Sequence, residues 1–189
     1  MIRRPAGLPA VMLVSLALAG CATSGVMHRG AASPSRPLAS PAAAGEHAVS
    51  QVVRGAVGDR VMTLSCVVSV KDGVMSVVGL NAMGVRLFTI RYDGKQVNVD
   101  KSFAVPDAIT PDRLLADLQL VYWPLSSLQD TLKPAGFDVT EPSAGTRRLR
   151  RGDRLIAEVH LAGADAWSAR AWLVNLEHGY SLQIDSEPL

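Results

Sequence analysis

Polar and apolar residues alternate along most of the chain from about residue 48, with the period of two that is typical of half-buried β-strands. In residues 60–71, for example, Met62, Leu64 and Cys66 fall on one side of the expected strand. The other alternating segments of this half are residues 75–82, 85–92 and 95–101. Asp-Gly or Met-Gly pairs separate these segments and favour tight turns, so the pattern predicts an antiparallel meander of four or five strands.

The periodicity becomes helical in the middle of the chain. Thr110 and Pro111 form a helix start, with a capping residue followed by proline at the first helical position. Leucines at 114, 115 and 118 and a valine at 121 recur at helical spacing, and Pro124 ends this run. A second short helix is expected from residue 125 to residue 132.

Alternation resumes after the helices and predicts about five further strands. The segments are residues 137–141, 146–151, 155–161, 171–177 and 180–186. The expected fold class is therefore mainly β with a helical insert (α+β). We expect a curved antiparallel sheet or incomplete β-barrel, with the helical residues 111–132 packed on its concave side as a lid.

The N-terminus carries a different signal. Arg3 and Arg4 precede an apolar run over residues 11–19, which is the order of a secretory signal peptide. The run ends in Leu18-Ala19-Gly20-Cys21, which resembles the lipobox of bacterial lipoproteins. The resemblance implies cleavage before Cys21, attachment of diacylglycerol to its thiol, and a protein that faces the periplasm. Alanine rather than aspartate after this cysteine implies sorting to the outer membrane.

Residues 22–46 separate this anchor from the alternating region. Seventeen of these 25 residues are Ala, Ser, Gly or Pro, a composition that buries little apolar surface and predicts disorder. The sequence thus divides into a signal peptide (residues 1–20), a lipidated cysteine with a disordered linker (residues 21–46) and a single β domain (residues 47–189).

Charge and cysteine content exclude several classes of protein. Removal of the signal peptide takes away two arginines, so the formal charge falls from +2 to zero, which does not favour a nucleic-acid partner. With Cys21 lipidated, Cys66 has no partner within the chain, so the domain is not a disulfide scaffold. The alternation predicts that Cys66 is a small buried hydrophobic residue.

Motifs for catalysis or metal binding are missing from the sequence. The four histidines have no zinc-ligand spacing, and neither Gly-x-Ser-x-Gly nor Ser-x-x-Lys is present. We therefore expect no metal, no cofactor and no enzymatic activity.

Two groups of residues remain as candidates for binding. The first is apolar and aromatic, and it either fills a closed core or lines a hydrophobic cavity; its members are Phe88, Leu118, Tyr122, Trp123, Leu125, Trp172 and Tyr180. The second comprises Arg147, Arg148, Arg150 and Arg151, which either contact an anionic partner or form a solvated hairpin tip. Strand alternation divides these arginines between the two faces of the sheet.

Three segments resemble an uncharacterised family of small bacterial lipoproteins, a domain of unknown function associated with aryl-polyene gene clusters. They are Tyr122-Trp123-Pro124-Leu125, the arginine-rich hairpin through Leu155-Ile156-Ala157-Glu158, and the tail over residues 173–184. The strand–helix–strand order is also similar to the LolA/LolB fold, in which an incomplete barrel covered by helices holds lipoprotein acyl chains.

These resemblances imply a membrane-anchored lipoprotein that binds or helps to localise a lipid-like ligand or a lipoprotein acyl chain. Lipoprotein-sorting or other envelope proteins are the expected protein partners. One alternative is a non-catalytic scaffold of an outer-membrane assembly, and another is an enzyme that acts on lipid or polyene esters.

Overall fold

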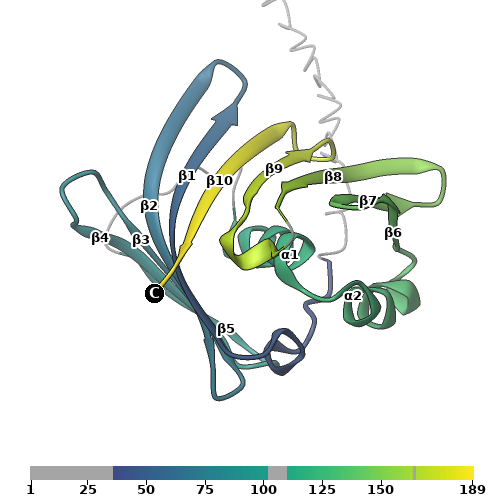
Figure 1. The fold of residues 1–189 in the computed structure, drawn as a ribbon, viewed down its shortest axis with the longest axis horizontal. Helices are drawn as coiled ribbons and strands as arrows, with labels where there is room; N and C mark the ends of the chain where they lie inside the picture. The colour runs from purple at the N-terminus through teal and green to yellow at the C-terminus, as the bar shows by residue number, and fades with distance from the viewer. Residues whose placement is uncertain (1–35, 102–109, 164) are drawn as a thin grey trace, which may run out of the picture. The chain divides into compact units, whose positions relative to one another are not determined.

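The alternating segments form one ten-stranded antiparallel sheet that curves around two helices (Figure 1). The computed structural model describes residues 36–101, 110–163 and 165–189, which all fall in one compact unit of the chain. The strands are β1 (His47–Val57), β2 (Arg60–Lys71), β3 (Val74–Leu80), β4 (Arg86–Tyr92), β5 (Val97–Lys101), β6 (Asp138–Ser143), β7 (Thr146–Arg151), β8 (Arg154–Ala162), β9 (Arg170–Asn175) and β10 (Tyr180–Pro188). The helices are α1 (Pro111–Tyr122) and α2 (Leu125–Leu132), and three short 3₁₀ turns cover Pro41–Ala44, Lys133–Ala135 and Ala166–Ser168.

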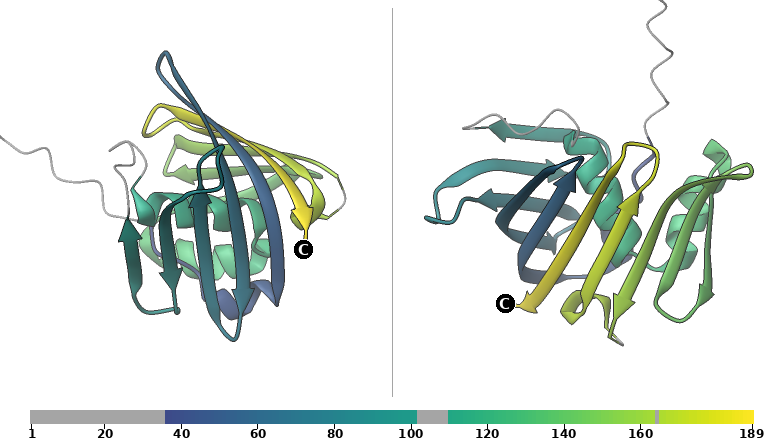
Figure 2. Two further views of the ribbon diagram at one scale, coloured as in Figure 1. Left: turned by 90° about the vertical axis from the view of Figure 1, so that its left-hand side faces the viewer. Right: turned by 90° about the horizontal axis from the view of Figure 1, so that it is seen from above.

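The strand order is β5-β4-β3-β2-β1-β10-β9-β8-β7-β6. Strands β1–β5 and β6–β10 each form a meander of neighbouring hairpins, and β1 joins the two meanders by pairing with β10. Both helices lie on the concave side, so the core fills the space between them and the inner face of the sheet (Figure 2). This arrangement confirms the predicted open, curved antiparallel sheet with a helical insert.

Helix α1 has the boundaries that its sequence predicts. The hydroxyl of Thr110 accepts a hydrogen bond from the Arg113 amide at 3.4 Å, and Pro111 occupies the first turn. The last intrahelical bond runs from the Trp123 amide to the Gln119 carbonyl, and Pro124 follows. From Leu115 to Tyr122 every residue of α1 is buried, because the sheet curves around the helix.

One glycine is required by close packing within the sheet. A Cβ atom on Gly79 would lie 2.4 Å from the ring of Phe88, its cross-strand neighbour on β4. The missing side chain therefore leaves room for the buried Phe88 ring beside β3.

Residues 36–46 differ from the disordered linker that we expected. Ala39 is buried, and the side chain of Gln119 bonds to both its amide and its carbonyl, at 2.7 and 2.9 Å. Trp123 donates its indole N–H to the Ser40 carbonyl at 2.9 Å. The expected linker was too long at its C-terminal end, because the Gln119 amide and the Trp123 indole satisfy backbone groups of an Ala/Pro-rich segment. Residues 21–35, including Cys21, and the signal peptide lie outside the described residues.

None of the described helices is long and apolar enough to cross a membrane.

Candidate functional site

An apolar groove runs between α1 and the inner face of the sheet. On the sheet side, its lining residues form rows across three strands, because each inward-facing residue of β1 lies opposite one residue of β2 and one of β10. Val53 pairs with Leu64 and Ile184, and Gly55 pairs with Met62 and Leu182. The other lining residues are Gln51 and Cys66 on the sheet, Val77 and Phe88 on β3 and β4, and Leu114 and Leu118 on α1.

The groove is closed at one end and open at the other. The groove has a volume of about 40 Å³, and the lining residues Gln51 and Cys66 at one end of it are buried. Toward the β1–β2 hairpin the lining residues Val53, Met62 and Leu64 are only half-buried. This hairpin extends beyond α1, as Figure 1 shows, so apolar side chains remain uncovered there.

A small polar cluster lies at the closed end. Gln51 donates from Nε2 to the hydroxyl of Tyr122 at 2.7 Å and to Ser186 at 3.3 Å, and the two hydroxyls are 2.9 Å apart. Burial raises the pKa of Tyr122 to about 12 and that of the neighbouring Cys66 thiol to about 12. Both groups are therefore protonated at neutral pH, and Cys66 has the buried position that its strand pattern predicts.

The seven residues that we expected to line a hydrophobic cavity do not lie together in the structure. Phe88 and Leu118 line the groove, and Tyr122 contributes to the polar cluster at its end. Trp123 and Tyr180 are buried core residues, and Leu125 packs half-buried against the core. Trp172 instead lies outward on β9, 37% exposed, with the Arg170 guanidinium 5.9 Å from its ring centre.

Several lining residues were not identified from the sequence. The alternation of residues 60–71 places Met62, Leu64 and Cys66 on one face, and this signal could have identified them. Gln51 and Gly55 gave no apolar signal of their own, although their pairing with Cys66 and Met62 in the β1–β2 hairpin places them on the same face.

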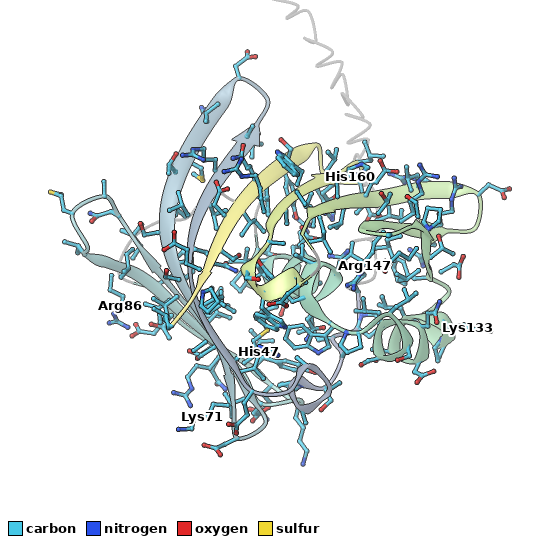
Figure 3. The ribbon with its side chains drawn as sticks, viewed as in Figure 1. His47, Lys71, Arg86, Lys133, Arg147 and His160 are labelled. Carbon is cyan, nitrogen blue, oxygen red and sulfur yellow. The ribbon has the colours of Figure 1, made fainter. Side chains whose placement is uncertain are left out.

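The arginine cluster is divided in the way that strand alternation predicts. Arg148 bonds to Glu158 at 2.6 Å and Arg150 to the Asp153 carbonyl at 2.9 Å, whereas the Arg151 guanidinium lies 5.2 Å from the Phe137 ring centre. Arg147 points inward (Figure 3) and is 9% exposed, so its candidate role as a surface contact for an anionic partner has to be corrected.

Arg147 instead caps the C-terminal end of α1. Its Nη1 atom donates to the carbonyls of Leu120, Val121 and Trp123 at 3.0, 3.1 and 2.8 Å. Its Nε atom bonds to Glu141 at 3.3 Å. The last carbonyls of a helix have no partner within the helix, and their partial negative charge favours a cation at this position. Arg147 thereby fixes α1 to β7 on the concave side.

A second buried charge holds the other side of α1. Asp117 is 1% exposed and forms an ion pair with Arg36. Its other carboxylate oxygen accepts hydrogen bonds from the Tyr180 hydroxyl and, at 3.4 Å, from Asn175. Burial and the adjacent carboxylate raise the pKa of Tyr180. Nothing in the sequence indicated this network, because its members come from four separate segments.

Among the described residues no group of three or more His, Cys, Asp or Glu side chains could hold a metal ion.

Comparisons with known proteins bear on family and fold. A family model described as a protein of unknown function, DUF3261, matches residues 48–188, which extend from β1 to β10. No protein of curated function matches the chain.

A LolA superfamily protein from Nitrosomonas europaea is similar in structure, with a TM-score of 0.42 and 10% sequence identity over 75% of this chain and 84% of that chain. A DUF1329 family protein from Desulfovibrio piger gives a TM-score of 0.34 and 10% identity over 75% and 83% of the two chains. The family match confirms the expected domain of unknown function over residues 48–188, and neither the lipoprotein character nor the aryl-polyene association follows from it.

Proposed function

The chain belongs to the DUF3261 family of proteins of unknown function, and we propose that its domain binds the hydrophobic chain of a lipid-like ligand. The observation that carries this proposal is the apolar groove between α1 and the inner face of β1, β2 and β10. Among the described residues that line the groove, only Gln51 and Cys66 have polar side chains, and none is charged. Such a surface suits an acyl or polyene chain.

The dimensions of the groove determine how such a chain would lie. The groove volume of about 40 Å³ exceeds the roughly 10–15 Å³ that one water-sized group needs on the same measure, but it is too small to enclose a whole acyl chain. One end of the ligand would occupy the enclosed part, and the rest would lie along the half-buried residues Val53, Met62 and Leu64. Burial of about eight methylenes contributes roughly 6 kcal/mol before the cost of association, so we expect a dissociation constant no tighter than about 40 μM for these contacts alone.

Filling the groove tests this proposal. A Cβ atom on Gly55 would make ordinary contacts with Leu182 and Met62, at 3.4 and 3.5 Å, and both residues line the groove, so the side chain of Gly55→Leu would extend into it. We expect this variant to bind the fluorescent apolar probe N-phenylnaphthylamine at least about tenfold more weakly than the unsubstituted chain, a loss of about 1.4 kcal/mol. Fluorescence titration, with displacement by dodecanol, provides the measurement.

Ala56→Leu is the matched control, because Ala56 is the next residue of β1 and faces the outer side. It should leave probe binding unchanged. Equal binding by Gly55→Leu and the unsubstituted chain would contradict the proposal, as would a failure of the unsubstituted chain to bind the probe.

We further propose that the domain is held at the outer membrane by a lipid on Cys21 and faces the periplasm. The lipobox pattern at Leu18-Ala19-Gly20-Cys21 supports this proposal. In cells fed radiolabelled palmitate, the chain should incorporate label, and Cys21→Ser should abolish incorporation because the acceptor thiol is lost. Cys66→Ser is the control and should retain the label, since Cys66 is buried in the domain. Label that persists in Cys21→Ser would contradict the anchor.

We propose a non-catalytic role for the domain. The buried Cys66 thiol is protonated at neutral pH, which makes it a poor nucleophile. A scaffold that uses the arginine hairpin has less support, because all four candidate arginines contact groups within the domain.

A further inference from the structure

The closed end of the groove holds a buried hydrogen-bond acceptor without a partner. Gln51 is 3% exposed and lines the groove, and its Nε2 atom donates hydrogen bonds to the hydroxyl groups of Tyr122 and Ser186. Its Oε1 atom is buried and has no hydrogen-bond partner among the described residues. A buried carbonyl oxygen of this kind costs free energy until a donor reaches it.

The surroundings of Gln51 restrict the donor that could satisfy it. None of the described residues that line the groove is charged, so a carboxylate or ammonium group would lose its hydration there without a counter-ion from them. A neutral hydroxyl group carries one donor hydrogen and keeps the rest of the ligand apolar. Gln51 lines this groove, and the groove volume of about 40 Å³ has room for a group of that size.

Resting on the proposed lipid binding, we propose that the preferred ligand is a long-chain alcohol or another apolar chain that ends in a neutral hydroxyl group. The hydroxyl enters first and donates to Gln51 Oε1 at the closed end. The chain then lies outward past Val53, Leu64 and Met62. The half-buried state of these three residues matches a chain that leaves the groove toward the hairpin.

A comparison of two probes on two proteins tests this assignment. Dodecanol and dodecyl methyl ether share an alkyl chain, but only the alcohol has a donor hydrogen. Each is titrated against N-phenylnaphthylamine bound to the full chain carrying Cys21→Ser, and to the same chain with Gln51→Met. The ratio of alcohol affinity to ether affinity should be about fivefold higher with Gln51 than with methionine, the effect of one neutral hydrogen bond. Leu64→Met, an apolar change in the same groove, should leave the ratio unaltered.

A second measurement does not depend on the folding of any variant. In the chain with Gln51, the resonance of its side-chain carbonyl carbon should shift on addition of dodecanol and not on addition of the ether. Equal ratios in the two proteins, or equal shifts with the two probes, would overturn the hydroxyl assignment while lipid binding stands. If neither probe displaces N-phenylnaphthylamine, the proposed function itself fails, and the hydroxyl assignment fails with it.

Discussion

Asp117→Ala is expected to lower the free energy of unfolding by about 3–5 kcal/mol, because it leaves the Arg36 guanidinium buried without its carboxylate. Tyr180 and Asn175 lose their shared acceptor at the same time. Urea unfolding followed by tryptophan fluorescence measures this loss.

A double-mutant cycle measures the interaction energy between Arg36 and Asp117 separately from the other effects of each substitution. Arg36→Met alone should also lower the free energy of unfolding. The double variant Arg36→Met with Asp117→Ala should lose clearly less free energy than the two single variants lose together. Purely additive losses would show that the buried ion pair contributes nothing of its own. The cycle also reports whether residues 36–46 are fixed to α1, since Arg36 enters the domain from that segment.

Arg147→Met is expected to lower the free energy of unfolding by about 3 kcal/mol. Methionine keeps much of the apolar stem but leaves the carbonyls of Leu120, Val121 and Trp123 without this donor. Burial of these groups prevents water from fully replacing the guanidinium, so the loss should exceed that of a surface substitution. Urea unfolding again provides the measurement.

Arg148→Met is the matched control, since Arg148 is the next residue of β7 and pairs with Glu158 on the more exposed side. This substitution should lower the free energy of unfolding by at most about 1 kcal/mol. Similar losses for Arg147→Met and Arg148→Met would contradict the assignment of Arg147 as the cap of α1.

The fold could be predicted from local patterns because each meander joins strands that are neighbours in sequence. Alternation placed Met62, Leu64 and Cys66 on one face, and the Thr110-Pro111 start located α1. The pairing of β1 with β10 is a contact between distant segments with no local signal, so the contact of Gln51 with Ser186 could not be predicted.

Local composition led to wrong predictions where the hydrogen-bond partners of a residue come from a distant segment of the chain. Arg147 belongs to a run of charges that suggested a surface, yet its partners are carbonyls of α1 that only the tertiary fold brings near. The Ala/Pro-rich residues 36–46 suggested disorder, yet Gln119 and Trp123 bond to their backbone. In both cases a buried backbone group required a side-chain partner from elsewhere in the chain.

The proposal that the inner groove binds a hydrophobic chain is tested most directly by locating a bound ligand. Nuclear Overhauser contacts between dodecanol and the methyl groups of the domain provide that location. We predict contacts to Leu64, Leu118 and Leu182, which line the groove from β2, α1 and β10. Contacts confined to Val174 and Leu176, exposed apolar residues at and beyond the end of β9, or no contacts at all, would contradict the proposal.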